Sequence, residues 1–276
     1  MDGQGLPEPI RILSDLHLGH EACALSNVRE IRPLLKGART VIFNGDTAEV
    51  RAKSFRARAA EEQAKLTTML EELGVEQTIY VTGNHDCRIS TTHHVDLCQG
   101  KLLVTHGDFL FRYVSPWSQK LRHCRPRIDA ILEACDQTRL ETDLDYRLEI
   151  TRQCCDALTV SQSSSPKGFI GLLKYVGKEV WPPTRLFTIL NVWRTSPKLM
   201  SQALDRYRPE AKAVVFGHIH YPKVWLRKDR YLINTGGFLN MPKALVVDVQ
   251  GQELQVHRVV KRDGECHLDQ GKTIQL

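Results

Sequence analysis

The sequence predicts an α/β protein in which β-sheets stack against each other and helices lie outside them. Apolar runs rich in β-forming residues recur through the first half of the chain and again near residue 215. Continuous apolar runs of this kind are typical of strands buried on both faces between helical layers. After Ala211 the pattern becomes purely β, which predicts further strands at the end of the chain. Together these observations favour stacked sheets within helical layers.

The predicted strands each end in a small or polar cluster. In chain order they are "IRILSD", "TVIFNGD", "TIYVTGNHD", "KLLVTHGD" and "KAVVFGHIH". Residues 51–73 predict a helix, because Leu66, Met69 and Leu70 share one face and Gly74 follows at the usual stop position. "LCQGKLL" around Gly100 predicts a hairpin.

The amino-acid composition limits the classes of protein to which the chain can belong. The chain has 276 residues, of which 42% are hydrophobic and 25% charged, so a chain dominated by disorder is excluded. The formal net charge of +6 favours anionic partners such as phosphates, nucleic acid or an acidic membrane surface, without selecting among them. We expect a single domain over residues 1–276, interrupted by a helical insert at about residues 110–205.

The N-terminus has neither a basic region nor an apolar stretch typical of a signal peptide, so we expect a cytoplasmic protein. The eight cysteines are scattered and form no CxxC pair, which favours reduced, structural thiols over a zinc ribbon.

Polar side chains that could bind a metal follow five predicted strands. They are Asp15, His17, Asp46, Asn84, His85, Asp86, His106, His218 and His220. Taken singly, each of these residues is more simply explained as a turn former or as a buried histidine. In α/β sheets, however, ligands bind beyond the carboxyl ends of the strands, where these residues would converge. Jointly they predict a metal site.

The types of ligand residue narrow the choice of metal ion. Carboxylate and amide oxygens mixed with imidazoles suit Mn, Fe, Co, Ni or Zn better than calcium. No cysteine lies in the motifs, which disfavours a closed structural zinc site. These candidate ligands exceed the needs of one ion. Two ions bridged by one carboxylate, about 3.5–4 Å apart, form the clamp used for displacement at phosphorus.

Five short motifs make the chain resemble the calcineurin-like metallophosphoesterases. In order they are "SDLHLG", "NGD", "GNHD", "THGD" and "GHIH". The resemblance implies a four-layered αββα sandwich that holds two divalent ions, with manganese expected and Fe, Zn, Ni or Co as alternatives.

The resemblance also implies roles for the candidate residues. Asp15, His17 and His220 would hold one metal, Asn84, His106 and His218 the other, and Asp46 would bridge them. His85 would protonate the leaving oxygen or stabilise charge on the phosphate. Asp86 would orient the loop or His85, or would serve only as a turn residue.

Within the family, the chain is most similar to the UDP-2,3-diacylglucosamine diphosphatases of lipid A biosynthesis. The similarity lies in "DLHL", in Gly45-Asp46-x-x-Glu49, in Tyr221-Pro222 after the last motif, and in a helical insert. One departure is His85, where those enzymes have arginine. The resemblance implies a hydrolase that cleaves the pyrophosphate of a UDP-diacylglucosamine-like lipid. The alternatives are a generic phosphodiesterase or nuclease, and a non-catalytic scaffold.

The predicted insert is basic and aromatic. Residues 112–127 hold five Lys or Arg and no acid, and we expect Arg122, Arg125 and Arg127 to bind substrate phosphate. The following residues to Ile150 predict helix, with a leucine stripe that suits packing. Residues 168–200 mix apolar and basic side chains, which suits a lid, a peripheral contact with the inner membrane or a packed helix pair; residues 161–166 would be its hinge. Phosphate-containing small molecules or lipid-like substrates are the expected partners, ahead of nucleic acid.

Overall fold

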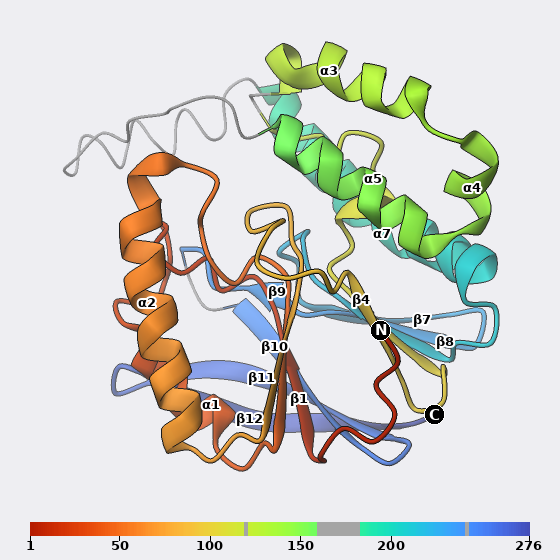
Figure 1. Cartoon of the computed structure of the whole chain (residues 1–276). Coiled ribbons are helices and arrows are strands. Elements are labelled where there is room, and N and C mark those ends of the chain that lie inside the picture. The colour runs from red at the N-terminus through yellow and green to blue at the C-terminus, as the bar shows by residue number, and fades with distance from the viewer. Residues whose placement is uncertain (119–120, 159–182, 241–242) are drawn as a thin grey trace.

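The computed structural model describes residues 1–118, 121–158, 183–240 and 243–276. Within them the chain forms four layers, in which two β-sheets pack face to face and helices cover the outer face of each (Figure 1). The expected α/β class and its αββα layering are therefore confirmed.

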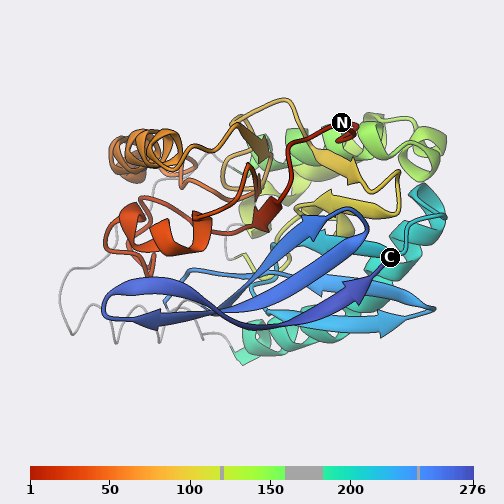
Figure 2. The same ribbon diagram turned by 90° about the horizontal axis from the view of Figure 1, so that it is seen from below.

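The first sheet has seven strands in the order β12-β11-β10-β1-β2-β3, with β9 paired to β10. Its strands are β1 (Ile10–Leu13), β2 (Thr40–Asn44), β3 (Gln77–Val81), β9 (Gly236–Gly237), β10 (Lys243–Gln250), β11 (Glu253–Arg262) and β12 (Glu265–Gln275). Strands β1, β2 and β3 run parallel, whereas β10 joins β1 antiparallel. Strands β10 to β12 form a long twisted meander, seen in blue from below in Figure 2. The predicted terminal strands are confirmed.

The second sheet has five strands in the order β4-β5-β6-β8-β7. They are β4 (His94–Leu97), β5 (Leu102–Thr105), β6 (Ala213–Phe216), β7 (Lys223–Arg227) and β8 (Arg230–Asn234). Strands β5, β6 and β8 run parallel, and β4 pairs antiparallel with β5. The hairpin predicted around Gly100 is this β4–β5 pair, and Gly100 turns it with φ of 80°.

Short and long helices cover the first sheet. They are η1 (Val28–Ile31), α1 (Arg32–Leu35) and α2 (Lys53–Glu72). The predicted apolar face of α2 is buried at Leu66, Met69 and Leu70 against the sheet cluster. The helix stops where Gly74 takes φ of 70° and its N–H bonds to Glu71 O at 3.0 Å, as the stop signal predicted.

The described helices between β5 and β6 lie on the opposite side of the sandwich from α1 and α2 (Figure 1); η2, α5 and α7 cover the second sheet, and α3 and α4 pack on α5. They are η2 (Asp108–Leu110), α3 (Leu121–Ala134), α4 (Gln137–Thr142), α5 (Leu144–Ala157) and α7 (Pro183–Tyr207). The leucine stripe expected to pack is buried at Leu140, Leu144 and Leu148. Helix α7 packs Val192, and further along Met200 and Leu204, onto the same sheet.

Part of the insert lies outside the described residues. The hinge expected at residues 161–166 and the apolar stretch from residue 168 to 182 fall there. In the rest of the chain, no helix is both long enough and apolar enough to cross a lipid bilayer.

Apolar side chains from both sheets fill the space between them. Ile12 and Ile42 of the first sheet and Val104 and Val215 of the second belong to this central cluster, and each is fully buried. This packing holds the two sheets together, so that the loops after β1, β2, β3, β5 and β6 lie near one another.

Candidate metal centre

The backbone at the strand ends is strained where it presents polar side chains. Five of the seven expected metal ligands have a positive φ: Asp15 at 54°, His17 at 50°, Asp46 at 52°, His218 at 71° and His220 at 52°. Non-glycine residues rarely adopt this region, and each costs about 1–3 kcal/mol unless the surrounding structure enforces it. Strain concentrated in this way is typical of a functional site.

Two glycines in the motifs make room for the carboxylates. A Cβ at Gly83 would collide with the backbone and side chain of Asp46, and one at Gly217 would collide with the side chain of Asp15. The chain therefore needs glycine at both positions for the strand ends to approach one another so closely.

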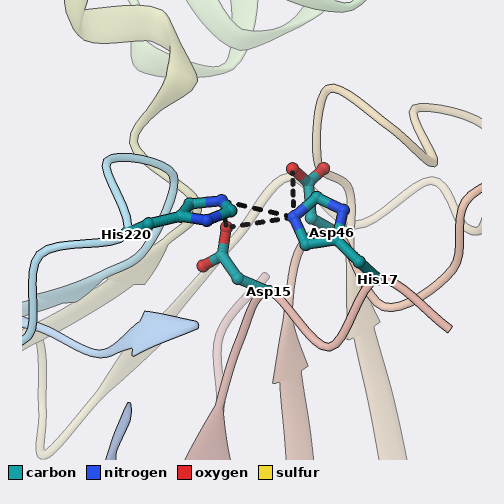
Figure 3. A group of neighbouring side chains, drawn as sticks. All are labelled: Asp15, His17, Asp46 and His220. Carbon is teal, nitrogen blue, oxygen red and sulfur yellow. Dashed lines mark hydrogen bonds and ion pairs between the residues drawn. The ribbon is translucent and has the colours of Figure 1, made fainter. Parts of the chain in front are cut away.

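The first group of side chains comprises Asp15, His17, Asp46 and His220, which point toward one another (Figure 3). One ligand atom from each lies within 4.8 Å of the others. The Nε2 atoms of His17 and His220 are 3.2 Å apart, and His220 Nε2 lies 3.2 Å from Asp15 Oδ1. His17 Nε2 lies 3.7 Å from Asp46 Oδ2. Two imidazoles and two carboxylates that converge in this way fit a transition-metal ion.

The second group comprises Asp46, His106 and His218, whose ligand atoms also lie within 4.8 Å of one another. His106 Nε2 is 3.4 Å from Asp46 Oδ2 and 3.4 Å from Asn84 Oδ1, which brings the amide to the same point. Asp46 belongs to both groups. The structure thus brings all seven expected ligands together in two overlapping sets.

Backbone carbonyls orient two of these imidazoles. His106 Nδ1 donates to Asn44 O at 3.0 Å, and His218 Nε2 donates to Val114 O at 2.9 Å. Each bond selects one tautomer and leaves the other ring nitrogen with a free lone pair, as in known metal sites. Burial, reinforced by the nearby His106, lowers the pKa of His218 to about 3, so its ring is neutral, the form that binds metal.

The side chain of His85 contacts the carboxylate of Glu49, a residue for which the sequence alone indicated no role. His85 Nδ1 lies 2.5 Å from Glu49 Oε2, whereas His17 Nδ1 lies 3.8 Å from the same oxygen. The side chain of Glu49 is 3% exposed and that of His85 is 28% exposed. Burial alone would lower the pKa of His85, but the charges of Glu49 and Asp46 outweigh it and raise that pKa. The spacing Gly45-Asp46-x-x-Glu49 was the signal in the sequence.

Asp86 organises a loop. Its carboxylate accepts hydrogen bonds from the backbone N–H groups of Gly83, Asp46, Thr47 and Ala48, at 3.0, 3.0, 2.7 and 3.2 Å. No hydrogen bond joins it to His85 within the described residues. Of the roles left open by the sequence, this geometry matches orientation of the loop that carries Asp46.

The three arginines expected to bind substrate lie on α3 and are exposed: Arg122, Arg125 and Arg127. Arg125 is also engaged elsewhere, because its Nε lies 3.5 Å from Asp129 Oδ2 and its guanidinium lies 5.2 Å from the centre of the Tyr113 ring. Among the described residues, none of the three contacts an expected metal ligand.

Glu49→Gln is expected to lower kcat about 10- to 100-fold, because outer partners of a site usually contribute that much. The neutral amide cannot hold His85 in its protonated form. Metal content, measured by elemental analysis, should stay unchanged. Glu61→Gln, which alters an exposed carboxylate paired with Lys65 on α2, is the matched control. Loss of metal together with rate would instead make Glu49 a ligand.

The chain is similar to several solved protein structures. No protein-family model matches the chain, and no curated protein sequence matches it. Vacuolar protein sorting 29 from Cryptosporidium parvum has a TM-score of 0.42 and 13% identity, covering 97% of each chain. A conserved protein from Streptococcus pneumoniae described as a predicted phosphoesterase has a TM-score of 0.38 and 17% identity, covering 97% of each chain.

Phosphopantetheinyl hydrolase from Mycobacterium tuberculosis has a TM-score of 0.30 and 13% identity, covering 84% of this chain and 90% of its own. Similarity at these TM-scores carries no argument about activity. The function of this chain must therefore be inferred from its own side chains.

Proposed function

We propose that the protein is a calcineurin-like metallophosphoesterase, a two-metal-dependent hydrolase of phosphoesters or pyrophosphates. The observation that carries this proposal is the pair of overlapping ligand groups that share Asp46 at the strand ends. One carboxylate common to two sets of nitrogen and oxygen donors suits two ions close together better than one. The five motifs, in family order, support the same conclusion.

The two proposed ions have separate sets of ligands that share one carboxylate. Asp15, His17 and His220 hold one ion, while Asn84, His106 and His218 hold the other, with Asp46 shared. Ions held there would polarise the phosphoryl group and lower the pKa of water. Manganese is the proposed metal, with Fe, Zn, Ni and Co as alternatives, because the donor set mixes oxygen and imidazole nitrogen.

His85 is the proposed proton donor to the leaving oxygen. Its Nδ1 is occupied by Glu49, so Nε2 is the nitrogen left to face a substrate. Glu49 favours the protonated ring, which is the form that a general acid needs. The backbone N–H of His85 donates to Asp46 Oδ1 at 2.7 Å, which ties the proton donor to the shared carboxylate.

For the substrate we propose the pyrophosphate of a UDP-diacylglucosamine-like lipid. The motif with Glu49 and the Tyr221-Pro222 pair support this class. A further support is an exposed apolar face at the start of α7, where Leu186, Phe187 and Leu190 are 46%, 71% and 48% exposed. Such a face suits acyl chains or a peripheral contact with a membrane. The cytoplasmic side of the inner membrane is the proposed location.

A substrate screen tests the function. Purified protein with Mn²⁺ is assayed against UDP-diacylglucosamine, generic phosphodiesters, cyclic nucleotides and single-stranded DNA. We expect metal-dependent hydrolysis, fastest on the nucleotide-sugar lipid. Preference for DNA, with binding that falls steeply with salt, would support the nuclease alternative. Two bound ions without turnover on any substrate would support a scaffold.

Replacing Arg122, Arg125 and Arg127 together by Ala is expected to lower kcat/KM for the acylated nucleotide-sugar about 100-fold. The reason is that two lost charge-assisted hydrogen bonds to phosphate cost about 3 kcal/mol. Hydrolysis of a small chromogenic phosphodiester should stay within about threefold, because the arginines contact no expected metal ligand and remote binding energy matters only for a long substrate.

The matched control for this triple variant replaces three exposed basic residues of the β11–β12 hairpin, Arg258, Arg262 and Lys272. It changes net charge equally and should leave both substrates unaffected. Equal retention of both activities in the α3 variant would remove these arginines from substrate binding.

A further inference from the structure

We propose that residues 111–118, called here the Val114 loop, support the second ligand group through His218, and that Trp117 is a positioning residue for His218. The inference rests on the proposed two-metal function and deepens it. It makes the helical insert a determinant of how tightly one of the two ions is bound.

The contact that carries the inference is the hydrogen bond from His218 Nε2 to Val114 O, at 2.9 Å. The corresponding bond of His106 goes to Asn44 O, which belongs to a central strand of the sandwich. One imidazole of the second group is thus oriented by the sheet, and the other by a loop 104 residues away along the chain. Because Nε2 is engaged by Val114 O, Nδ1 is the ring nitrogen of His218 left to bind an ion.

The Val114 carbonyl is held firmly in place. Val114 has φ of 60°, which is a genuine outlier for a β-branched residue and persists only where packing enforces it. Its side chain is 1% exposed and belongs to a cluster with Ile128 and Leu132 of α3 and Cys155 of α5. Its N–H also donates to Phe111 O at 3.0 Å. The insert helices therefore fix the direction of the carbonyl.

Trp117 confines the His218 ring from a second direction. The two ring centres are 5.1 Å apart at 45°, and Phe111 lies 6.1 Å from the same imidazole. Phe111 and Trp117 meet edge to face at 6.1 Å and 79°. The loop is tied to α7 as well, because Arg185 Nε donates to Trp117 O at 3.1 Å. Ring contacts and the carbonyl together leave His218 one orientation.

The first ligand group has no equivalent dependence. The side chains of Asp15, His17 and His220 make no hydrogen bond, ion pair or ring contact with the insert helices or the Val114 loop in the part of the chain that the structure describes. Disturbing the loop should therefore weaken one ion and spare the other. A merely structural role would affect both ions equally.

Calorimetric titration of metal-free protein with Mn²⁺ tests the proposal. Wild-type protein should bind two ions. Trp117→Ala should weaken one ion about 10- to 100-fold, the usual effect of losing an outer partner of a metal ligand, and leave the other within about threefold. Trp117→Phe, which retains an aromatic ring, should restore the affinity. Phe55→Ala is the matched control, since Phe55 packs on His20, which is not an expected ligand.

A double-mutant cycle identifies which ion is affected. If Trp117 acts through His218, Trp117→Ala should add little to the loss caused by His218→Ala, because coupled residues are not additive. Trp117→Leu keeps apolar bulk without an aromatic face, and it serves if the alanine variant does not fold. The selective loss should appear in that variant too.

Several outcomes would overturn the proposal. Unchanged affinity for both ions in the Trp117 variants would remove the positioning role. Equal weakening of both ions, or full additivity with His218→Ala, would make the loop a general stabiliser of the fold. These results leave the proposed function intact, whereas a wild-type protein that binds no metal would end both.

Discussion

Asp46→Asn is expected to abolish hydrolysis and to weaken the binding of both metal ions. Asp46 is the one side chain shared by the two ligand groups, and its Oδ2 lies 3.7 Å from His17 Nε2 and 3.4 Å from His106 Nε2. A bridging carboxylate neutralises two cations at once, and an amide of the same shape carries no charge. Single-metal variants should each spare one ion, but this change should reduce occupancy of both.

The measurement combines elemental analysis with turnover at saturating Mn²⁺. Asp269→Asn, on the exposed strand β12, is the matched control and should retain two ions and normal rates. Two ions at full occupancy with normal turnover in Asp46→Asn would contradict the bridging role.

His85→Ala is expected to lower kcat by about 10²- to 10⁴-fold, which is the usual contribution of a general acid. Metal content should remain that of the wild type, because neither His85 nor Glu49 is among the seven expected ligands. The Nδ1 of His85 contacts Glu49 at 2.5 Å, and its ring meets the ring of His17 edge to face at 4.7 Å. The loss should be larger than that of Glu49→Gln, since His85→Ala removes the proposed proton donor itself, whereas Glu49→Gln removes only the carboxylate beside it.

Steady-state kinetics and metal analysis of the same protein samples decide this point. His267→Ala removes a histidine that is 38% exposed on β12 and should have no effect on either measurement. If His85→Ala loses metal in parallel with rate, His85 is a ligand and the proposed division of labour is wrong. A substrate with a good leaving group should be affected less, because it needs less protonation.

The candidate site could be anticipated because its signals are local. Each of the motifs combines a buried apolar strand with polar residues directly after it, as in "TVIFNGD" and "TIYVTGNHD". Parallel strands place their carboxyl ends at one edge, so chain position alone predicted that Asp46 and Asn84 would meet. The helix over residues 53–72 was also predictable, from its apolar face and Gly74.

The partners of those residues were not predictable in the same way. In the sequence, Glu49 appeared only as one position of a motif. Its contact with His85 depends on how two loops that follow different strands pack together. Asp86 appeared as a possible partner of His85, but it accepts four backbone hydrogen bonds from residues 46–48 and 83. Backbone donors leave no signature in a sequence.

The sequence by itself predicted the order of the strands along the chain and the candidate metal ligands, because hydrophobic periodicity, apolar runs and the residues that follow a strand are all local features of the chain. Only the tertiary structure decided that Glu49 contacts His85 and that Val114 orients His218. The latter contact joins residues 104 positions apart through a backbone carbonyl, and Val114 reaches it only in a strained conformation that the insert helices enforce. Such a contact depends on packing between distant segments, which local sequence patterns do not encode.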